Sequence, residues 1–187
     1  SKSKGNVIDP IVMTEKYGAD ALRMSLVWGA LIENDISLSE DNVKGQRNFA
    51  NKIWNLGRYI QMVFGNEEIA FSEPEKQRPE DKKILKELNK LSEKVTKALD
   101  NYKLNQAAED IYEFAWHKFA DKYVEESKEK ARNKDISTLY TLRHVYLNIL
   151  KLLHPFMPFV TETIWSELES LRKYPDQLLI TSSWPKA

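Results

Sequence analysis

Hydrophobic residues recur along most of the chain at steps of three and four, which is the spacing of one face of an α-helix. Such stripes run through residues 44–64, 81–101, 104–132, 136–153 and 159–171. Short polar or proline-containing breaks separate them, and amphipathic helices joined in this way are typical of an antiparallel helix bundle. We therefore expect an all-α fold whose leucine-rich stripes form the core.

The first 42 residues follow a different pattern from the rest. Their apolar spacing predicts two short helices, over residues 10–17 and 19–28, separated by Gly18. Residues 35–39 alternate polar and apolar side chains, which predicts one short strand. Ser39 is then expected to cap the long helix that follows.

These patterns divide the chain into three parts. Residues 1–42 form a small leading segment, residues 43–174 form the helix bundle, and residues 175–187 form an extended tail.

The predicted helix over residues 44–64 has two unlike faces. One is an apolar stripe that we expect to be buried, made of Phe49, Ile53, Leu56, Ile60, Val63 and Phe64. The other carries cations, amides and a tyrosine but no acid: Arg47, Asn48, Asn51, Lys52, Asn55, Arg58 and Tyr59. Cations suit phosphates, amides can pair with base edges, and a tyrosine ring can stack on an unpaired base. Taken alone, the helix fits RNA binding and an ordinary basic surface equally well.

Charge is balanced over the whole chain but not along it. Lys and Arg total 28 and Asp and Glu also total 28, so net charge does not indicate a nucleic-acid partner. Residues 43–66 nevertheless hold four cations and no anion, whereas residues 67–81 hold six acids. A neutral total can therefore conceal a polarised surface.

Composition excludes several classes of protein and site. Hydrophobic residues make up 42% and mean hydropathy is −0.55, as in a soluble globular protein. No apolar run approaches the roughly 18 residues of a membrane span. The chain has no cysteine, which excludes disulfides and thiolate metal sites, and its three histidines lie far apart, so no metal is expected. The absence of cysteine also agrees with a cytoplasmic protein.

The N-terminal stretch SKSKGN places two lysines, two serines and a glycine within six residues. A loop of this kind can bring ammonium and backbone N–H groups to a phosphate. It lacks the spacing of a P-loop, and taken alone it is better interpreted as an exposed basic tail.

Together with KYGADALR a few residues later, this stretch resembles the signature loop of class I aminoacyl-tRNA synthetases, written KMSKS. The chain would begin after the Lys-Met of that motif, so Ser1, Lys2 and Ser3 match its last three positions. In that family the loop helps to bind ATP and stabilises the leaving pyrophosphate. The resemblance therefore implies that Ser1, Lys2 and Ser3 contact ATP and that Lys2 is catalytic.

The resemblance continues along the chain in three further stretches. Residues 18–23, GADALR, are similar to the start of the stem-contact fold in the valyl, isoleucyl, leucyl and methionyl subgroup. RNFANKIWN at 47–55 and HPFMPFVTETIW at 154–165 look like the anticodon-binding domain of its valyl members. The likeness implies an all-α domain whose partner is a tRNA, of the valine isoacceptor by preference. It also implies contacts from Asp20 and Arg23 to the inside of the tRNA bend, although an acid at a helix start is equally well explained by the helix dipole.

A complete enzyme of this kind would use ATP, with magnesium in solution, to join valine to its tRNA through an aminoacyl-adenylate. The catalytic nucleotide-binding fold, the HIGH motif and the editing domain would precede this segment, so we expect the segment alone to be inactive and to hold no cofactor tightly. We expect a cytoplasmic monomer with neither DNA nor membrane as partner. The alternatives are the same region of an isoleucyl or leucyl enzyme, or an interaction bundle without an RNA role.

Several aromatic residues have two interpretations. Tyr59 is expected to stack on an anticodon base, or else to seal the edge of the bundle as a half-buried side chain. Trp54, Trp116 and Trp165 fall on or near apolar stripes and are expected in the core.

Overall fold

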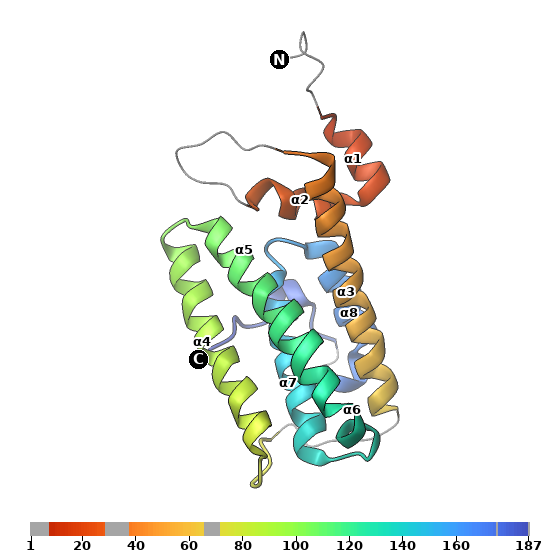
Figure 1. Ribbon diagram of the computed structural model, residues 1–187, viewed down its shortest axis with the longest axis vertical. Coiled ribbons are helices and arrows are strands. Elements are labelled where there is room, and N and C mark those ends of the chain that lie inside the picture. Colours follow the sequence, from red (N-terminus) through yellow and green to blue (C-terminus); the bar gives the residue numbers. More distant parts are fainter. Residues whose placement is uncertain (1–7, 29–37, 66–71, 175, 187) are drawn as a thin grey trace.

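A computed structural model describes residues 8–28, 38–65, 72–174 and 176–186. These residues form helices and turns without any strand, which confirms the all-α prediction, and Figure 1 shows the arrangement. The helices are α1 (Pro10–Tyr17), α2 (Ala19–Val27), α3 (Glu40–Phe64), α4 (Pro79–Asp100), α5 (Leu104–Glu113), α6 (Glu125–Arg132), α7 (Ile136–Leu153) and α8 (Pro158–Glu167). The strand predicted over 35–39 falls mainly on residues outside the described ones.

Helices α1 and α3 both begin at a side-chain cap. The Asp9 side chain accepts a hydrogen bond from the backbone N–H of Ile11, and Ser39 accepts one from Asn42. Each satisfies an N–H group that the first helical turn leaves without a partner. Gly18 makes the sharp turn between α1 and α2. Its φ of +89° is a backbone conformation that residues with a side chain rarely adopt.

The long helices α3, α4, α5–α6 and α7 run side by side along the molecule, and α1 and α2 pack across one end of it (Figure 1). A single core joins the bundle helices, and a small second cluster ties the first two helices to the start of α3: Met13, Ala21, Leu22 and Val43. All six residues of the predicted apolar stripe of α3 are buried. The amphipathic pattern was therefore sufficient to orient this helix.

The third predicted helix is continuous in space but not uniform. Between α5 and α6, residues Phe114–Val124 form a π-helix, which turns more widely than an α-helix. Phe114 and Phe119 are both buried although they lie five residues apart. The widened turn therefore keeps both rings on the core side.

The C-terminal part differs from the prediction in two places. The last helix was predicted to reach residue 171, but α8 ends at Glu167 and a 3₁₀ turn, Glu169–Leu171, follows. Leu168 and Leu171 are both buried, because residues three apart share one side of a 3₁₀ turn. The tail is not simply extended, since Leu179–Thr181 forms another 3₁₀ turn.

A buried network of hydrogen bonds links three elements at the other end of the bundle. Asp81, at the start of α4, is fully buried and accepts hydrogen bonds from Arg78, Tyr123 and Ser137. It therefore joins α4 to the π-helix and to the start of α7.

In the part of the chain that the structure describes, no helix is both long and apolar enough to cross a membrane.

Candidate nucleic-acid interface

The polar face of α3 lies on the outside of the bundle. Five of its predicted residues are exposed: Arg47, Asn48, Asn51, Asn55 and Arg58. Within the described ranges, the three asparagine amides and the Arg58 guanidinium make no hydrogen bond or ion pair with other residues. Their donors and acceptors are therefore available to a ligand. The exposure expected of this face is confirmed for these five residues, whereas Lys52 and Tyr59 are half-buried.

Lys52 differs from the other cations of this face because it already has a partner. Its Nζ lies 2.6 Å from Oδ1 of Asp121 and 5.6 Å from the centre of the Trp116 ring. The same ion pair lowers the pKa of Asp121. A phosphate at Lys52 would have to compete with this carboxylate, so Lys52 is less available to an anion than Arg58.

Tyr59 is half-buried and packs against the main core. Its hydroxyl is buried without a hydrogen-bond partner in the described structure, and burial raises its pKa. The ring also borders a shallow depression with Asn55, Arg58 and Met62. This placement agrees with the alternative of a side chain that seals the edge of the bundle, and stacking on a base stays a prediction.

Of the three tryptophans predicted in the core, Trp54 is the one for which the prediction is wrong. Trp165 is buried and Trp116 is half-buried against the core, but Trp54 is 36% exposed. The reason is its position on the helix, because residues 47, 51, 54 and 58 fall on one stripe at steps of four, three and four. That spacing, applied to the polar face, could have placed the indole there.

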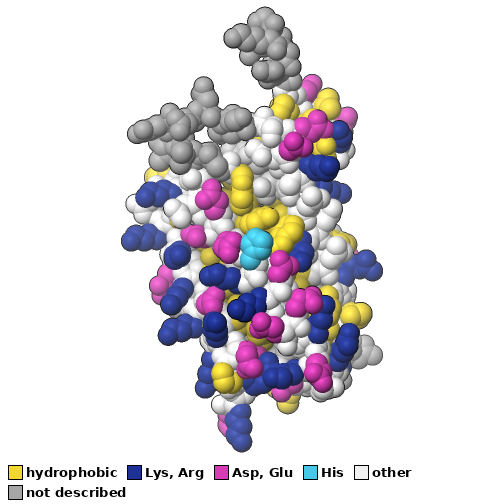
Figure 2. All heavy atoms as spheres, viewed as in Figure 1, with side chains coloured by type: hydrophobic (Ala, Val, Ile, Leu, Met, Phe, Trp, Pro, Cys, Tyr) yellow, Lys and Arg dark blue, Asp and Glu magenta, His cyan; other side chains and the backbone are white. Residues whose placement is uncertain are grey.

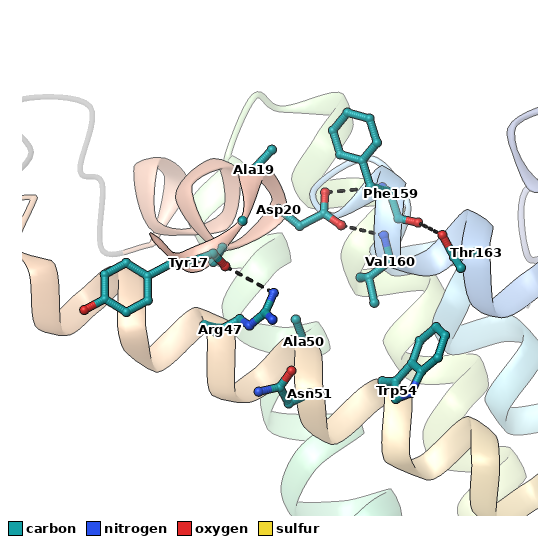
Figure 3. Close-up of a pocket in the computed structure, with 12 residues that line it drawn as sticks. Tyr17, Ala19, Asp20, Arg47, Ala50, Asn51, Trp54, Phe159, Val160 and Thr163 are labelled. Carbon is teal, nitrogen blue, oxygen red and sulfur yellow. Dashed lines mark hydrogen bonds between the residues drawn. The ribbon is translucent and has the colours of Figure 1, made fainter. Parts of the chain in front are cut away.

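A groove runs beside this stripe and is shown in Figure 3. It encloses about 530 Å³ between the junction of α1 and α2, the first half of α3 and the start of α8. Arg47, Asn51 and Trp54 form one wall, and Phe159, which is 63% exposed, lies on the other. The Arg47 guanidinium is anchored there by a 3.4 Å hydrogen bond to the Tyr17 carbonyl. A cation, an amide and two exposed rings therefore meet in one concave site.

Asp20 and Arg23 both bind backbone groups at the start of α8 or just before it. The Asp20 carboxylate accepts hydrogen bonds from the N–H groups of Phe159, at 3.3 Å, and Val160, at 2.6 Å (Figure 3). It thereby caps α8 from α2. Burial raises the pKa of Asp20, and the two backbone N–H groups oppose that shift. Arg23 donates to the carbonyls of Phe156 and Pro155.

Two sequence motifs that are far apart in the chain thus form one structural joint. Residues 18–23 supply the carboxylate and the guanidinium, and residues 154–160 supply the backbone groups that they bind. Asp20 lies in the first turn of α2, as the dipole explanation requires, and its carboxylate also binds the N-terminus of α8. A contact of either residue with tRNA stays a prediction.

The remaining predicted site residues, Ser1, Lys2 and Ser3, lie outside the described residues. Among the residues that are described, no group of three or more His, Asp or Glu side chains could hold a metal ion. The chemistry that the described site offers is recognition: charge for phosphates, amides for base edges and exposed rings for stacking.

Comparisons with known proteins agree with this geometry. Residues 81–187 match the family described as the anticodon-binding domain of tRNA ligase, and residues 1–39 match the class I tRNA synthetases for I, L, M and V. A valine–tRNA ligase of Aquifex aeolicus is 44% identical over 186 residues, covering 90% of this chain and 16% of its own length. One from Geobacter sulfurreducens is 39% identical over 198 residues, covering 100% of this chain and 22% of its own length.

Solved structures share the fold. A ternary complex of a LeuRS from Agrobacterium radiobacter with tRNA and LeuAMS aligns with a TM-score of 0.74 at 25% identity, over 100% of this chain and 22% of that one. Methionyl-tRNA synthetase of Mycobacterium tuberculosis with methionyl-adenylate aligns with a TM-score of 0.75 at 26% identity, over 90% of this chain and 35% of that one. The chain spans less than a quarter of the length of the two curated relatives.

Proposed function

The chain belongs to the anticodon-binding-domain family of class I tRNA ligases, and from this premise we propose that its helix bundle holds the anticodon arm of a tRNA against the exposed face of α3. The curated relatives are named valine–tRNA ligases, so the proposed partner is the valine isoacceptor. Its proposed task is positioning, because gripping the far arm of the tRNA fixes where the acceptor end can lie.

The observation that carries this proposal is the acid-free stripe of α3. Arg47, Asn51, Trp54 and Arg58 share one exposed line along the helix, and Asn48 and Asn55 lie on the neighbouring line. An ordinary surface helix intersperses acids with its cations, whereas this face offers nothing that would repel a phosphate backbone. Arg47 and Arg58 would hold phosphates, and the asparagines would pair with base edges.

The other predicted contacts take a secondary place in the proposal. Lys52 would reach RNA only by giving up Asp121, and Tyr59 would offer only the exposed part of its half-buried side chain. Asp20 and Arg23 would act indirectly, by fixing the groove in which Arg47 and Trp54 lie.

The activity of a whole enzyme is part of the same proposal. We propose that this segment serves a ligase that attaches valine to its tRNA with ATP through an aminoacyl-adenylate, as the family membership supports. Ser1, Lys2 and Ser3 would then belong to its ATP-binding loop, with Lys2 facing the phosphates.

The first test compares tRNAs and one substitution. The chain should bind a valine tRNA more tightly than the same tRNA with an altered anticodon. Arg58→Ala should weaken binding about fivefold to tenfold and should reduce the slope of log affinity against log salt by about one, as loss of one phosphate contact predicts. Fluorescence anisotropy over a series of salt concentrations measures both quantities.

Lys90→Ala is the matched control, because Lys90 is an exposed cation on α4, away from this face. It should leave both affinity and salt slope unchanged. Equal binding of all RNAs, with Arg58→Ala indistinguishable from the control, would favour a protein-interaction bundle. A preference for isoleucine or leucine tRNA would keep the function and change the amino acid.

A second test separates the two aromatic candidates for base stacking. Trp54→Ala should weaken binding of the tRNA by about tenfold, because a stacked base contributes about 1–3 kcal/mol. Tyr59→Phe, which keeps the ring and removes the buried hydroxyl, should leave affinity unchanged. If Tyr59→Ala rather than Trp54→Ala reduced the affinity, the stacking position would lie at the end of α3.

A further inference from the structure

The groove beside α3 has a second wall, which the interface proposed above leaves out. Three residues of α8 form this wall: Phe159, Val160 and Thr163. Small residues of α2 and α3 also line the groove: Ala19, Ala21 and Ala50. Because small side chains leave the space between the two walls open, the groove is a concave site rather than a flat surface.

Two large aromatic side chains are exposed at this groove, one on each wall. Trp54 is 36% exposed and Phe159 is 63% exposed, and Figure 3 shows them at opposite edges of the site. A single exposed ring on a protein surface needs no explanation. Two rings that border the same hollow leave a larger apolar surface in water, and such a surface is a candidate for ligand binding.

The position of Phe159 is fixed through its backbone rather than through its ring. Its N–H group donates a 3.3 Å hydrogen bond to the Asp20 carboxylate, and its carbonyl accepts a 2.8 Å hydrogen bond from the Thr163 hydroxyl. These bonds hold the residue at the edge of the groove. The ring itself stays largely exposed, so it can contact a ligand without giving up a polar partner.

Arg47 places a positive charge at the same groove. Its Nη1 donates a 3.4 Å hydrogen bond to the Tyr17 carbonyl and lies 3.2 Å from the position that a Cβ on Gly18 would occupy. The bare backbone of Gly18 therefore makes room for the guanidinium. Among the described residues no carboxylate forms an ion pair with Arg47.

The acid nearest to hand does not neutralise this charge. Asp20 is the only acid among the described residues that line the groove. Its carboxylate is already occupied, because it accepts hydrogen bonds from two N–H groups of α8. The guanidinium of Arg47 is therefore available to a phosphate.

The dimensions of the groove suit one nucleotide. Its volume of about 530 Å³ is in the range of small-ligand pockets. Arg47 and Trp54 lie seven residues apart, which is about 10 Å along a helix and a length that one nucleotide can span from phosphate to base. Base pairs in a double helix are stacked on one another, so their faces are not free to meet an aromatic ring in the groove.

We propose that the groove binds one unpaired nucleotide of the RNA held by α3, with its phosphate at Arg47 and its base against Trp54 and Phe159. This inference rests on the function proposed above and adds to it a defined ligand and a second stacking ring, from α8. Stacking accepts any base, and the Asn51 amide, which makes no hydrogen bond within the described ranges, can pair with a base edge or a sugar hydroxyl. The groove therefore selects an unpaired nucleotide over a base pair.

The test compares two RNA duplexes of the same sequence, one fully paired and one with a single unpaired adenosine bulged from one strand. Fluorescence anisotropy measures the affinity of each for the 187-residue chain. The bulged RNA is expected to bind about tenfold more tightly, which is the effect of one stacked base. Phe159→Ala should reduce this preference to about twofold and should leave binding of the paired duplex unchanged.

Two further variants separate the ring from its bulk. Phe159→Tyr keeps the ring and should bind as the wild type does. Phe159→Leu keeps an apolar side chain without the ring and should behave as Phe159→Ala does. Tyr174→Ala is the matched control, because the Tyr174 side chain is 61% exposed and does not line the groove. It should change neither affinity, and circular dichroism checks that every variant is folded.

Equal binding of the two duplexes by the wild type would overturn the proposal. A preference for the bulge that survives in folded Phe159→Ala and Phe159→Leu would do the same, and it would leave the groove as a site for a protein side chain. Weaker binding of both duplexes alike would make Phe159 a general backbone contact and would also contradict the proposal. Arg58→Ala should weaken both duplexes and keep the preference for the bulge, so this proposal can fail while the α3 face stands.

Discussion

Replacing Asp81 with alanine is expected to destabilise the fold by about 3–4 kcal/mol, because the hydroxyls of Tyr123 and Ser137 lose their acceptor and Arg78 loses its nearer carboxylate, with Asp135 at 3.8 Å. The Asp81 side chain is fully buried. Its oxygens lie 3.0 and 3.1 Å from two nitrogens of Arg78, 2.7 Å from the Tyr123 hydroxyl and 2.6 Å from the Ser137 hydroxyl. Alanine would remove an acceptor from all four donors at once.

Thermal and urea unfolding measure this loss. For a chain of this size the midpoint of thermal unfolding should fall by roughly 10 °C. Glu80→Ala is the control, because Glu80 occupies the same first turn of α4 but is exposed. It should change stability by no more than about 0.5 kcal/mol. If both variants lost the same amount, the helix dipole rather than the buried network would explain the effect.

The same carboxylate sets a dependence of stability on pH. Burial alone would raise the pKa of Asp81, but hydrogen bonds from Arg78, Ser137 and Tyr123 outweigh burial and hold it below its usual value. The folded chain then keeps the charge where the unfolded chain begins to bind a proton. The stabilisation is therefore complete above the unfolded pKa of about 4 and is lost as pH falls through the folded pKa. The difference in stability between the wild type and Asp81→Asn should stay constant from pH 5 to 8 and shrink below about pH 4.

Asp81 also shows what a sequence alone could not reveal. The apolar stripe predicted the helix it starts, but its partners Tyr123 and Ser137 lie 42 and 56 residues away. Periodicity describes how one helix divides into faces, and it carries no information on which polar group meets which across the core. Asp20 is the same case, since the backbone groups that it caps are 139 and 140 residues further on.

Helix boundaries that depend on neighbouring residues alone were predicted correctly. Helix α7 begins and ends at the predicted residues, and the cap predicted at Ser39 makes its hydrogen bond to the backbone of α3. The π-helix was missed because it depends on how Phe114 and Phe119 fit the core together, not on the propensity of either.

On α3 the exposed polar residues were predicted, but Trp54, which lies among them, was predicted to be in the core. Trp54 was assigned to the core because large apolar side chains are usually buried. Its helical position beside Asn51 and Arg58 was the stronger signal. The groove it borders depends on the approach of α8, which no pattern within α3 could indicate.

Gly57→Ala is expected to have the second large effect on stability. The usual rule for glycine in a helix predicts a gain in stability, whereas we expect a loss. Gly57→Ala in the middle of a helix normally stabilises by about 1 kcal/mol. Here a Cβ would lie 2.6 Å from the hydroxyl of Tyr146 and 3.1 Å from Cγ2 of Ile164. Tyr146 is fully buried, and its hydroxyl donates a 2.8 Å hydrogen bond to the carbonyl of Ile53. The ring has no space into which to retreat, so Gly57→Ala is expected to destabilise by about 2–3 kcal/mol.

Gly45 provides a matched control in the same helix, because nothing lies within 4 Å of the position that its Cβ would occupy. Gly45→Ala should stabilise the chain by up to about 1 kcal/mol, as helix propensity alone predicts. Opposite signs for two identical substitutions in one helix would assign the effect of Gly57→Ala to the approach of α7 and α8. If both variants gained stability, the close packing at Gly57 would be wrong.

The Tyr146 hydroxyl can be tested as the specific obstacle by a double-mutant cycle. Tyr146→Phe alone should cost about 1 kcal/mol, since it loses one hydrogen bond, while the Ile53 carbonyl keeps its partner within the ladder of α3. Removing the hydroxyl also opens the space that the new methyl group needs. The double variant should therefore be more stable than Gly57→Ala, although it contains a second destabilising change. Simple addition of the two losses would instead place the clash on Ile164, whose side chain faces the same glycine from α8.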